Sequence, residues 1–272
     1  MKVHELGEGD PEVAVVGAIH GDEPCGPLAI KRLLAEEPSV DRPVKLIIAN
    51  EEALEAGERY LDADLNRVFP GEAGADSHEH ALAADVARAV EGCTTLALHS
   101  TQSYEDPIGA VRSVDEVAKE LCPQLPVSVV VETDANTDGR LIQYPRTVEV
   151  ECGLQGTDEA AENGYELLRA FLAATGVLPL GEETLRLPVP DPDDVPVFRI
   201  RRPIPKPEGT EYEVYVDNFE IVTAGTAFAA VDGEAVYAEE DFYPVLLSPY
   251  GYADIFGYIS EQIGTVGSWA TA

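Results

Sequence analysis

Short apolar runs alternate with amphipathic segments along the first 175 or so residues of this chain. The runs are continuously apolar, as expected of strands whose two faces are both covered by helices, and such alternation is typical of an α/β domain. We predict strands over residues 13–19, 44–49, 94–99, 127–132 and 147–152. We predict helices over residues 24–36, 77–91 and 158–174. The expected core is therefore a sheet between layers of helices.

The character of the sequence changes beyond Gly181. Residues 187–192 (LPVPDP) have the composition of a proline-rich linker. Residues 197–200 and 212–216 then alternate as strands do, with little helical pattern around them. We therefore predict two domains, an α/β domain over residues 1–180 and a smaller β-rich domain over residues 185–272.

Acidic residues far outnumber basic ones. The chain has 51 Asp and Glu against 18 Lys and Arg, which gives a formal net charge of −33. Repulsion of this size destabilises a compact chain at low ionic strength, and it is screened in molar salt, where the Debye length is about 3 Å. Because the acidic residues are spread along the chain rather than gathered in a tail, we predict a halophilic protein of a high-salt cytoplasm. No basic stripe is present to meet phosphates, so nucleic-acid binding is disfavoured.

The cysteines and the apolar segments point to an intracellular protein. The four cysteines show no C-x-x-C spacing, and reduced thiols fit best. The chain has neither an apolar signal segment after Met1 nor a run of about 18 apolar residues, so neither export nor a membrane span is expected. The sequence leaves open whether the chain forms a homo-oligomer.

Polar side chains stand at the ends of three predicted strands. His20 and Glu23 follow the first strand, His99 ends the third, and Glu151 lies near the end of the fifth. Ligand sites of open α/β sheets lie outside the carboxyl ends of the strands, so we expect these residues to share a site. Two His and one Glu with a position left for water is a catalytic zinc arrangement. The sequence therefore predicts one Zn²⁺ per chain, held by His20, Glu23 and His99, although a lone strand-end histidine is more often a hydrogen-bonded core residue.

Four sequence blocks carry a family resemblance. They are residues 17–23 (GAIHGDE), residues 64–67 (DLNR), His99 at its strand end, and residues 151–153 (ECG). In these blocks and their order the chain resembles the succinylglutamate desuccinylase/aspartoacylase family of zinc carboxypeptidase-like hydrolases. The resemblance implies a mixed, mostly parallel sheet flanked by helices, with a smaller β-rich C-terminal domain. It also implies zinc chemistry on a small anionic acyl-amino-acid substrate of the N-acetylaspartate or N-succinylglutamate type.

The resemblance further assigns catalytic roles. Glu151 would be the general base and acid, and Glu149, on the same face of the strand, is its rival. Arg59 would stabilise the oxyanion as water adds to the acyl carbonyl. Asp64 would not bind the metal but would accept the free ring N–H of a metal-bound histidine.

Substrate-binding roles follow in the same way. Asn66 and Arg67 resemble the pair that binds a substrate carboxylate, a task suited to a planar guanidinium. Arg140 would be a second carboxylate ligand, with Arg146 as the alternative because the spacing to Glu151 is eleven rather than ten residues. Tyr252 resembles an active-site tyrosine supplied by the C-terminal domain, whereas the ordinary role of such an aromatic is in a core.

The predicted activity is zinc-dependent hydrolysis of the amide bond of an N-acylated acidic amino acid. A zinc carboxypeptidase acting on peptides would use the same metal and base, so the motifs leave it open. A small pocket closed by the C-terminal domain would favour the acyl-amino-acid hydrolase, and an open groove would favour peptides. A non-catalytic metal-binding module is disfavoured, because a structural zinc normally has four protein ligands and needs neither Glu151 nor Arg59.

Overall fold

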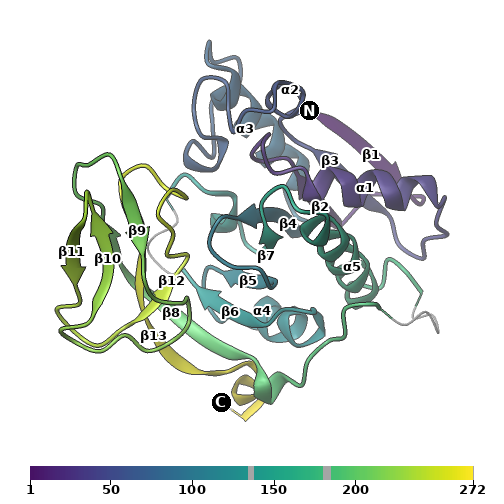
Figure 1. The fold of residues 1–272 in the computed structure, drawn as a ribbon. Coiled ribbons are helices and arrows are strands. Elements are labelled where there is room, and N and C mark those ends of the chain that lie inside the picture. Colours follow the sequence, from purple (N-terminus) through teal and green to yellow (C-terminus); the bar gives the residue numbers. More distant parts are fainter. Residues whose placement is uncertain (134–137, 180–184, 272) are drawn as a thin grey trace.

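A ten-stranded sheet runs through the computed structural model, which describes residues 1–133, 138–179 and 185–271 (Figure 1). Its strand order is β1-β3-β2-β4-β7-β5-β6-β8-β13-β12. These strands are β1 (Lys2–Leu6), β2 (Val13–Gly17), β3 (Val44–Ile48), β4 (Thr94–Thr101), β5 (Ile108–Val111), β6 (Val129–Glu132), β7 (Thr147–Leu154), β8 (Pro196–Pro205), β12 (Tyr243–Val245) and β13 (Ile255–Thr265). A second, antiparallel sheet contains β9 (Tyr212–Val214), β10 (Ala227–Val231) and β11 (Glu234–Tyr237).

The large sheet contains two parallel groups of strands that meet in an antiparallel pairing of β7 with β5, and its margins are antiparallel. Strands β3, β2, β4 and β7 run in one direction, and β5, β6 and β8 run in the other. Strand β1 pairs antiparallel with β3 at one margin, and β13 pairs antiparallel with β8 and β12 at the other. The predicted mixed, mostly parallel sheet is therefore confirmed.

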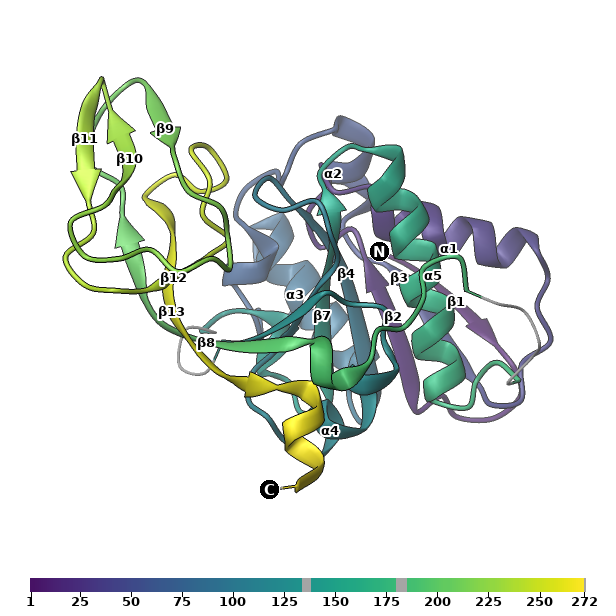
Figure 2. The same ribbon diagram turned by 60° about the horizontal axis from the view of Figure 1, so that its bottom comes forward.

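Helices cover both faces of the sheet, as the apolar strands require. The helices are α1 (Cys25–Ala35), α2 (Glu51–Ala56), α3 (His78–Val90), α4 (Glu116–Leu121) and α5 (Asp158–Ala174). Short 3-10 turns cover Leu65–Arg67, Cys122–Gln124, Leu141–Gln143, Pro192–Asp194 and Val266–Thr271. Helices α1 and α5 pack on one face and α3 on the other (Figures 1 and 2). Alternate residues of β2 enter the two cores, and every residue of that strand is buried.

All five predicted strands and all three predicted helices are present, with ends shifted by up to two residues. Strand β1, whose residues are mostly exposed, and strand β5, which is only four residues long, were not predicted. The six-residue helices α2 and α4 were not predicted either. These elements are too short or too exposed to show a hydrophobic period.

The C-terminal part is β-rich as predicted and is joined to the large sheet. Strand β8 pairs with β6, while β9–β11 lie to one side of the sheet, linked to it through the long strands β8 and β13 (Figure 2). The large sheet thus includes strands from both sides of residue 185, and the division into domains 1–180 and 185–272 stays a prediction. All four cysteines are free and buried. None of the helices in the described residues is long and apolar enough to cross a membrane.

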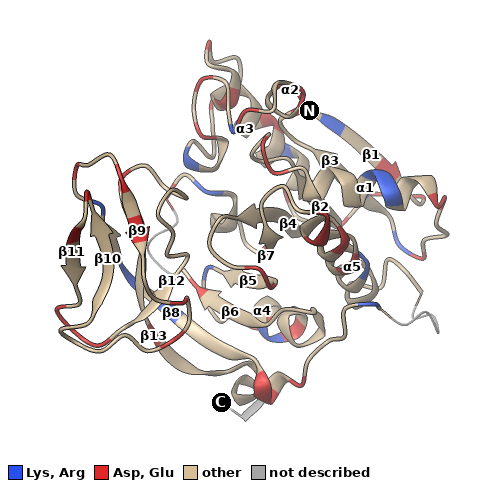
Figure 3. Ribbon diagram, viewed as in Figure 1, with Lys and Arg blue, Asp and Glu red and all other residues tan. Residues whose placement is uncertain are grey.

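Acidic residues are distributed over the periphery rather than gathered in one segment. Asp and Glu recur on α2 and α5 and, on another side of the molecule, on β9 and β11 of the small sheet (Figure 3). Most of these side chains are exposed, whereas Glu149 and Glu151 lie on the central strand β7.

Candidate active site

The turn between β2 and α1 carries His20 and Glu23. Strand β2 ends at Gly17, and the chain then passes close to α2. A Cβ on Gly21 would clash with the backbone of Ala53 and Glu58, so only glycine fits at this position. The Gly21 N–H donates to the carbonyl of Arg59 at 3.0 Å. This close approach fixes the turn against the segment that carries Arg59.

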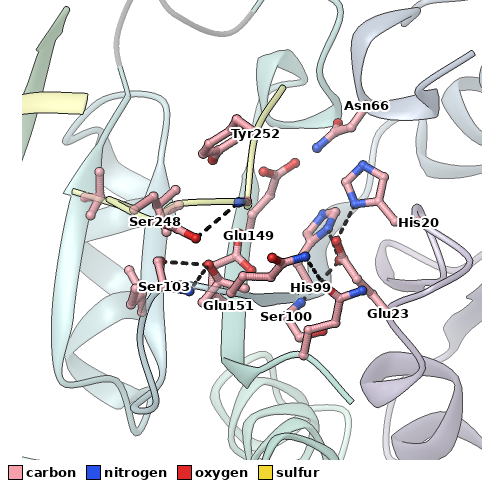
Figure 4. A pocket seen from close by; sticks show the side chains of 18 of the residues that line it. His20, Glu23, Asn66, His99, Ser100, Ser103, Glu149, Glu151, Ser248 and Tyr252 are labelled. Carbon is pink, nitrogen blue, oxygen red and sulfur yellow. Dashed lines mark hydrogen bonds and ion pairs between the residues drawn. The ribbon is translucent and has the colours of Figure 1, made fainter. Parts of the chain in front are cut away.

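Three side chains, which we call the ligand cluster, converge at this turn: His20, Glu23 and His99. These residues are 3–4% exposed, and one ligand atom from each lies within 4.8 Å of the others. His20 Nδ1 is 2.7 Å from Glu23 Oε1, and His99 Nδ1 is 3.0 Å from Glu23 Oε2. The backbone N–H of Ser100 also donates to Glu23 Oε2 at 3.2 Å. Figure 4 shows the cluster gathered on one side of the pocket.

The ligand cluster has the chemistry of a cation site. Burial opposes a charge on His99, but the hydrogen bond and the charge of Glu23 outweigh it and raise the pKa of His99 to about 10. Glu23 thus attracts positive charge between two imidazoles, and a divalent cation can supply that charge in place of protons. The second ring nitrogen of His20, Nε2, lies 3.0 Å from Asp64 Oδ1. An acceptor at this distance could fix the ring of a metal-bound histidine, and this role of Asp64 stays a prediction.

Arg59 lies directly against the ligand cluster. Its Nη1 donates to Glu23 Oε1 at 3.0 Å, and its Nε donates to Asp64 Oδ2 at 3.4 Å. Its Nη2 lies 3.0 Å from His20 Nε2. A third of the Arg59 side chain remains exposed, on the pocket side. The guanidinium is therefore held by two carboxylates and still faces the cavity.

Glu151 lies beside His99 on the neighbouring strand. The two residues are register partners in the parallel pairing of β4 with β7. Glu149 projects from the same face of β7, and both side chains line the pocket (Figure 4). Glu151 Oε2 and Glu149 Oε1 are buried with no hydrogen-bond partner in the described part of the chain. Burial raises the pKa of Glu151 to about 7, although the nearby His99 lowers it.

Two guanidinium groups, which we call the arginine pair, line the pocket next to this cluster: Arg67 and Arg140. Arg67 Nη1 donates to the carbonyl of Asn66 at 2.7 Å, and Arg140 Nη2 donates to the Tyr258 hydroxyl at 3.0 Å. Partial burial and the charge of Arg140 lower the pKa of Arg67. Within residues 1–133, 138–179 and 185–271, neither guanidinium has a carboxylate ion-pair partner.

Local backbone contacts bring the arginine pair together. The side-chain oxygen of buried Asn66 accepts the N–H of Leu141 at 2.8 Å. A Cβ on Gly139, whose φ is +77°, would clash with the backbone of Arg67. Phe69 N–H donates to the Gly139 carbonyl at 3.0 Å. These contacts tie the segment before Leu141 to the turn that carries Asn66 and Arg67.

The far wall of the pocket comes from the C-terminal part. Tyr252, in the loop between β12 and β13, lines the same cavity as the ligand cluster. Its ring packs edge-on against Tyr258 with centroids 5.9 Å apart. Figure 4 shows Tyr252 and Ser248 across the cavity from His20. The pocket is thus enclosed by strand ends of the α/β part and by a loop more than a hundred residues further along the chain.

Nearly every residue predicted for the site lines this pocket, and Asp64 lies directly behind His20. Arg146, the alternative to Arg140, does not line the pocket. It donates to Thr94 Oγ1 at the amino-terminal end of β4, whereas the pocket lies at the carboxyl ends of the strands. The pocket also contains residues that were not predicted, because no motif marks them. They are Ser100, Thr101, Gln102, Ser103, Ile108, Ala110, Val131, Thr133, Ile142, Gln155, Ile200, Leu246, Ser248, Gly251 and Tyr258.

Comparison with known proteins bears on this arrangement. Residues 9–104 match the model of the succinylglutamate desuccinylase/aspartoacylase catalytic domain. Over these residues the chain is similar to that family. A probable aspartoacylase of Nostoc sp. is 38% identical over 60 residues, and the aspartoacylase of Xenopus tropicalis is 36% identical over 80 residues. These alignments cover 21% and 28% of this chain, and the chain spans only 20% and 26% of the two relatives.

Solved structures share the fold over nearly the whole chain. The ectoine utilization protein EutE of Ruegeria pomeroyi has a TM-score of 0.73 at 20% identity, covering 95% of this chain and 88% of that one. Murine aminoacylase 3 has a TM-score of 0.70 at 21% identity, covering 95% and 98%. The succinylglutamate desuccinylase/aspartoacylase of Rhodobacter sphaeroides reaches 0.74 at 18%, covering 96% and 89%. At these identities the likeness shows the fold alone.

Proposed function

We propose that this chain is a zinc-dependent hydrolase that cleaves the amide bond of an N-acylated acidic amino acid. The observation that carries the proposal is the convergence of the ligand cluster, Glu151 and Arg59 around one pocket. The two imidazoles and one carboxylate would hold the metal. The match to the family's catalytic domain over residues 9–104 supports the same reading.

The residues around the ligand cluster divide the chemistry between them. Bound zinc would act as a Lewis acid on the acyl carbonyl and lower the pKa of a water from 15.7 to about 7. Glu151 takes the proton of the attacking water and returns it to the leaving amine, which requires a base within hydrogen-bond reach of both. Arg59 donates hydrogen bonds to the acyl oxygen as negative charge develops on it. Asp64 holds the His20 ring in one orientation.

The arginine pair gives the pocket its preference for carboxylates. Two adjacent cations without a carboxylate partner among the described residues repel each other, and a substrate carboxylate between them would relieve that repulsion. Their planar donors suit a carboxylate group. This local positive charge also offsets the repulsion that a net charge of −33 exerts on anionic substrates. We infer that Arg67 and Arg140 hold the amino-acid part of the substrate.

The C-terminal wall favours a small substrate over a peptide. Tyr252, Ser248 and Tyr258 line the same cavity as the ligand cluster, so a bound molecule is enclosed from both parts of the chain. An extended peptide needs an open groove, and this wall would obstruct it. The geometry thus favours acyl-amino-acid hydrolysis over carboxypeptidase activity.

An assay of amine release tests the proposal. The purified protein would be loaded with zinc and incubated in molar KCl with N-acetyl, N-succinyl and N-formyl derivatives of aspartate and glutamate. We expect turnover of at least one of them, its loss on chelation and its return when zinc is added. Elemental analysis should give one zinc per chain. Hydrolysis of peptides at their C-terminal bond, without hydrolysis of any of the acyl amino acids, would contradict the proposal.

A further inference from the structure

Glu79 is a fully buried carboxylate that lies outside the pocket. It occupies the first turn of α3 and is 0% exposed. Oε1 accepts the backbone N–H of Leu61 at 2.7 Å and an N–H of the Asn50 amide at 3.0 Å. Oε2 accepts the backbone N–H groups of Asp62 at 2.9 Å and Ala63 at 3.1 Å. Three consecutive amides of one loop therefore converge on a single side chain.

This carboxylate is stabilised as an anion. A buried charge is costly unless it is fully hydrogen-bonded, and here four donors meet its two oxygens. The start of a helix also favours negative charge. Burial alone would raise the pKa of Glu79, but the N–H groups of the loop and of Asn50 outweigh it, and the pKa is lowered. The loop amides thus face a permanent negative charge at neutral pH.

The loop held by Glu79 joins two residues of the active site. Arg59 precedes the three amides and contacts Glu23 and His20. Asp64 follows them and contacts His20 Nε2. The Arg59 end has a second anchor, because its carbonyl accepts the N–H of Gly21. The stretch between Arg59 and Asp64 is held by Glu79.

Further contacts make the anchor rigid. Asp62 Oδ2 accepts the backbone N–H of His78 at 2.8 Å, so the loop in turn caps α3. Asn50 Oδ1 accepts the N–H of Ala53 at 3.2 Å at the start of α2, and it lies 3.0 Å from His78 Nε2. The beginnings of both helices and the loop are therefore cross-linked around one carboxylate.

We propose that Glu79 is a positioning residue for the hydrolysis: by fixing the amides of residues 61–63 it keeps Arg59 and Asp64 directed at the ligand cluster. The catalytic consequence rests on the function proposed above, whereas the structural consequence does not. Glu79 touches neither the metal ligands nor the cavity, so its influence must pass through the loop.

Glu79→Gln is the most direct test because it keeps the shape of the side chain. One end of the amide would then present N–H groups to N–H donors, so half of the four hydrogen bonds are lost. We expect kcat to fall by about 100-fold, the effect of displacing a catalytic group by about 1 Å. KM should change much less, because the arginine pair is held by other contacts. Rescue by Glu79→Asp should be partial at best, because its carboxylate is one methylene too short.

A matched control is Glu166→Gln. Glu166 is also a buried glutamate on a helix, 4% exposed, and it accepts the backbone N–H of Arg186 at 2.8 Å far from the pocket. We expect it to lower Tm with no loss of kcat. An equal fall in kcat in both variants would mean that Glu79 acts only through global stability, and it would overturn the proposal.

A double-mutant cycle with Arg59→Ala tests the route of the effect. If Glu79 acts through the loop, Glu79→Gln should cost much less in the Arg59→Ala background than in the wild type. An undiminished loss of kcat in that background would show that the effect does not pass through Arg59. Should Glu79→Gln not fold, Glu79→Asp takes its place in the cycle.

Two measurements need no substrate and separate this proposal from the proposed function. Hydrogen exchange at the amides of residues 61–63 should be slow in the wild type and fast in Glu79→Gln. The NMR signals of the His20 ring nitrogens should shift in the variant, because Arg59 and Asp64 move with the loop. If both changes occur and the wild type hydrolyses no acyl amino acid, the proposed function fails and the positioning role stands. Unchanged exchange in the variant, or fast exchange with unchanged kcat and an unshifted His20 signal, overturns the positioning role.

Discussion

In the ligand cluster a carboxylate pairs with two imidazoles, whereas the arginine pair in the same pocket consists of two like charges side by side. Glu23 is bound by both histidines, by Arg59 and by a backbone N–H. Arg67 and Arg140 instead bond to neutral oxygens. The first arrangement offers ligand atoms to a cation, and the second offers N–H donors to an anion. On the proposed function, one part of the pocket would carry out the chemistry and the other would select the substrate.

The largest expected effect concerns the chemical part. Glu151→Gln should lower kcat by about 10²- to 10⁴-fold, the usual contribution of a general acid–base group, while zinc content is retained. Steady-state kinetics and elemental analysis would check this. Glu149→Gln is the matched control, since it lies on the same strand face and should leave most of the activity. Near-normal turnover of Glu151→Gln would remove Glu151 from the mechanism.

A smaller effect is expected at the arginine pair. Arg140→Ala should raise KM by about 10- to 100-fold with little change in kcat, because a charge-assisted hydrogen bond contributes about 1.5–3 kcal/mol. Arg146→Ala provides the control, because Arg146 lies at the amino-terminal end of β4, opposite to the pocket. If kcat and KM changed together in Arg140→Ala, the separation between the two parts of the pocket would not hold.

The salt dependence of Tm tests the acidic exterior of the protein rather than either part of the pocket. The acidic surface repels itself, so Tm is expected to rise between 0.1 M and 3 M KCl as the repulsion is screened. A gain of about 1 kcal/mol corresponds to roughly 2–4 °C for a chain of this size. Calorimetry at several KCl concentrations would measure the shift. An unchanged Tm would argue against adaptation to high salt.

The smallest expected effect is the pH dependence of the stability that Glu79 contributes. The pKa of Glu79 is lowered in the folded state, so its contribution to stability is present above the unfolded value of about 4.3 and is lost as pH falls through the folded value. The difference in unfolding free energy between wild type and Glu79→Gln should therefore be constant near neutral pH and shrink below about pH 4. Urea unfolding between pH 7 and pH 3 would measure it. A difference that grows with acidity would contradict the assignment.

The same contrast explains what the sequence could predict. The sequence predicted that His20, Glu23, His99 and Glu151 lie together because each stands at or just after the end of a predicted apolar strand, and these strands are neighbours in the sheet. Local pattern and strand direction predicted this grouping, whereas the choice of Glu151 over Glu149 came from the family resemblance.

The C-terminal wall carries no such signal. Tyr258 reaches Arg140 across 118 residues of sequence, and it does so only because β13 pairs with β8 and β8 with β6. The hydrophobic pattern does not predict those pairings. The role of Glu79 could not be predicted either, because an acidic residue in the first turn of a helix is ordinary in so acidic a chain.

The continuity of β6, β8 and β13 has a consequence for how molecules enter. A C-terminal part that swung away like a flap would have to break the main-chain ladder between β6 and β8. On the proposed function, access and adjustment to acyl groups of different length would then fall to loops that line the cavity, among them the loop between β12 and β13, which carries Ser248 and Tyr252. Replacing the loop between β12 and β13 would then change the preferred acyl group and leave the sheet intact.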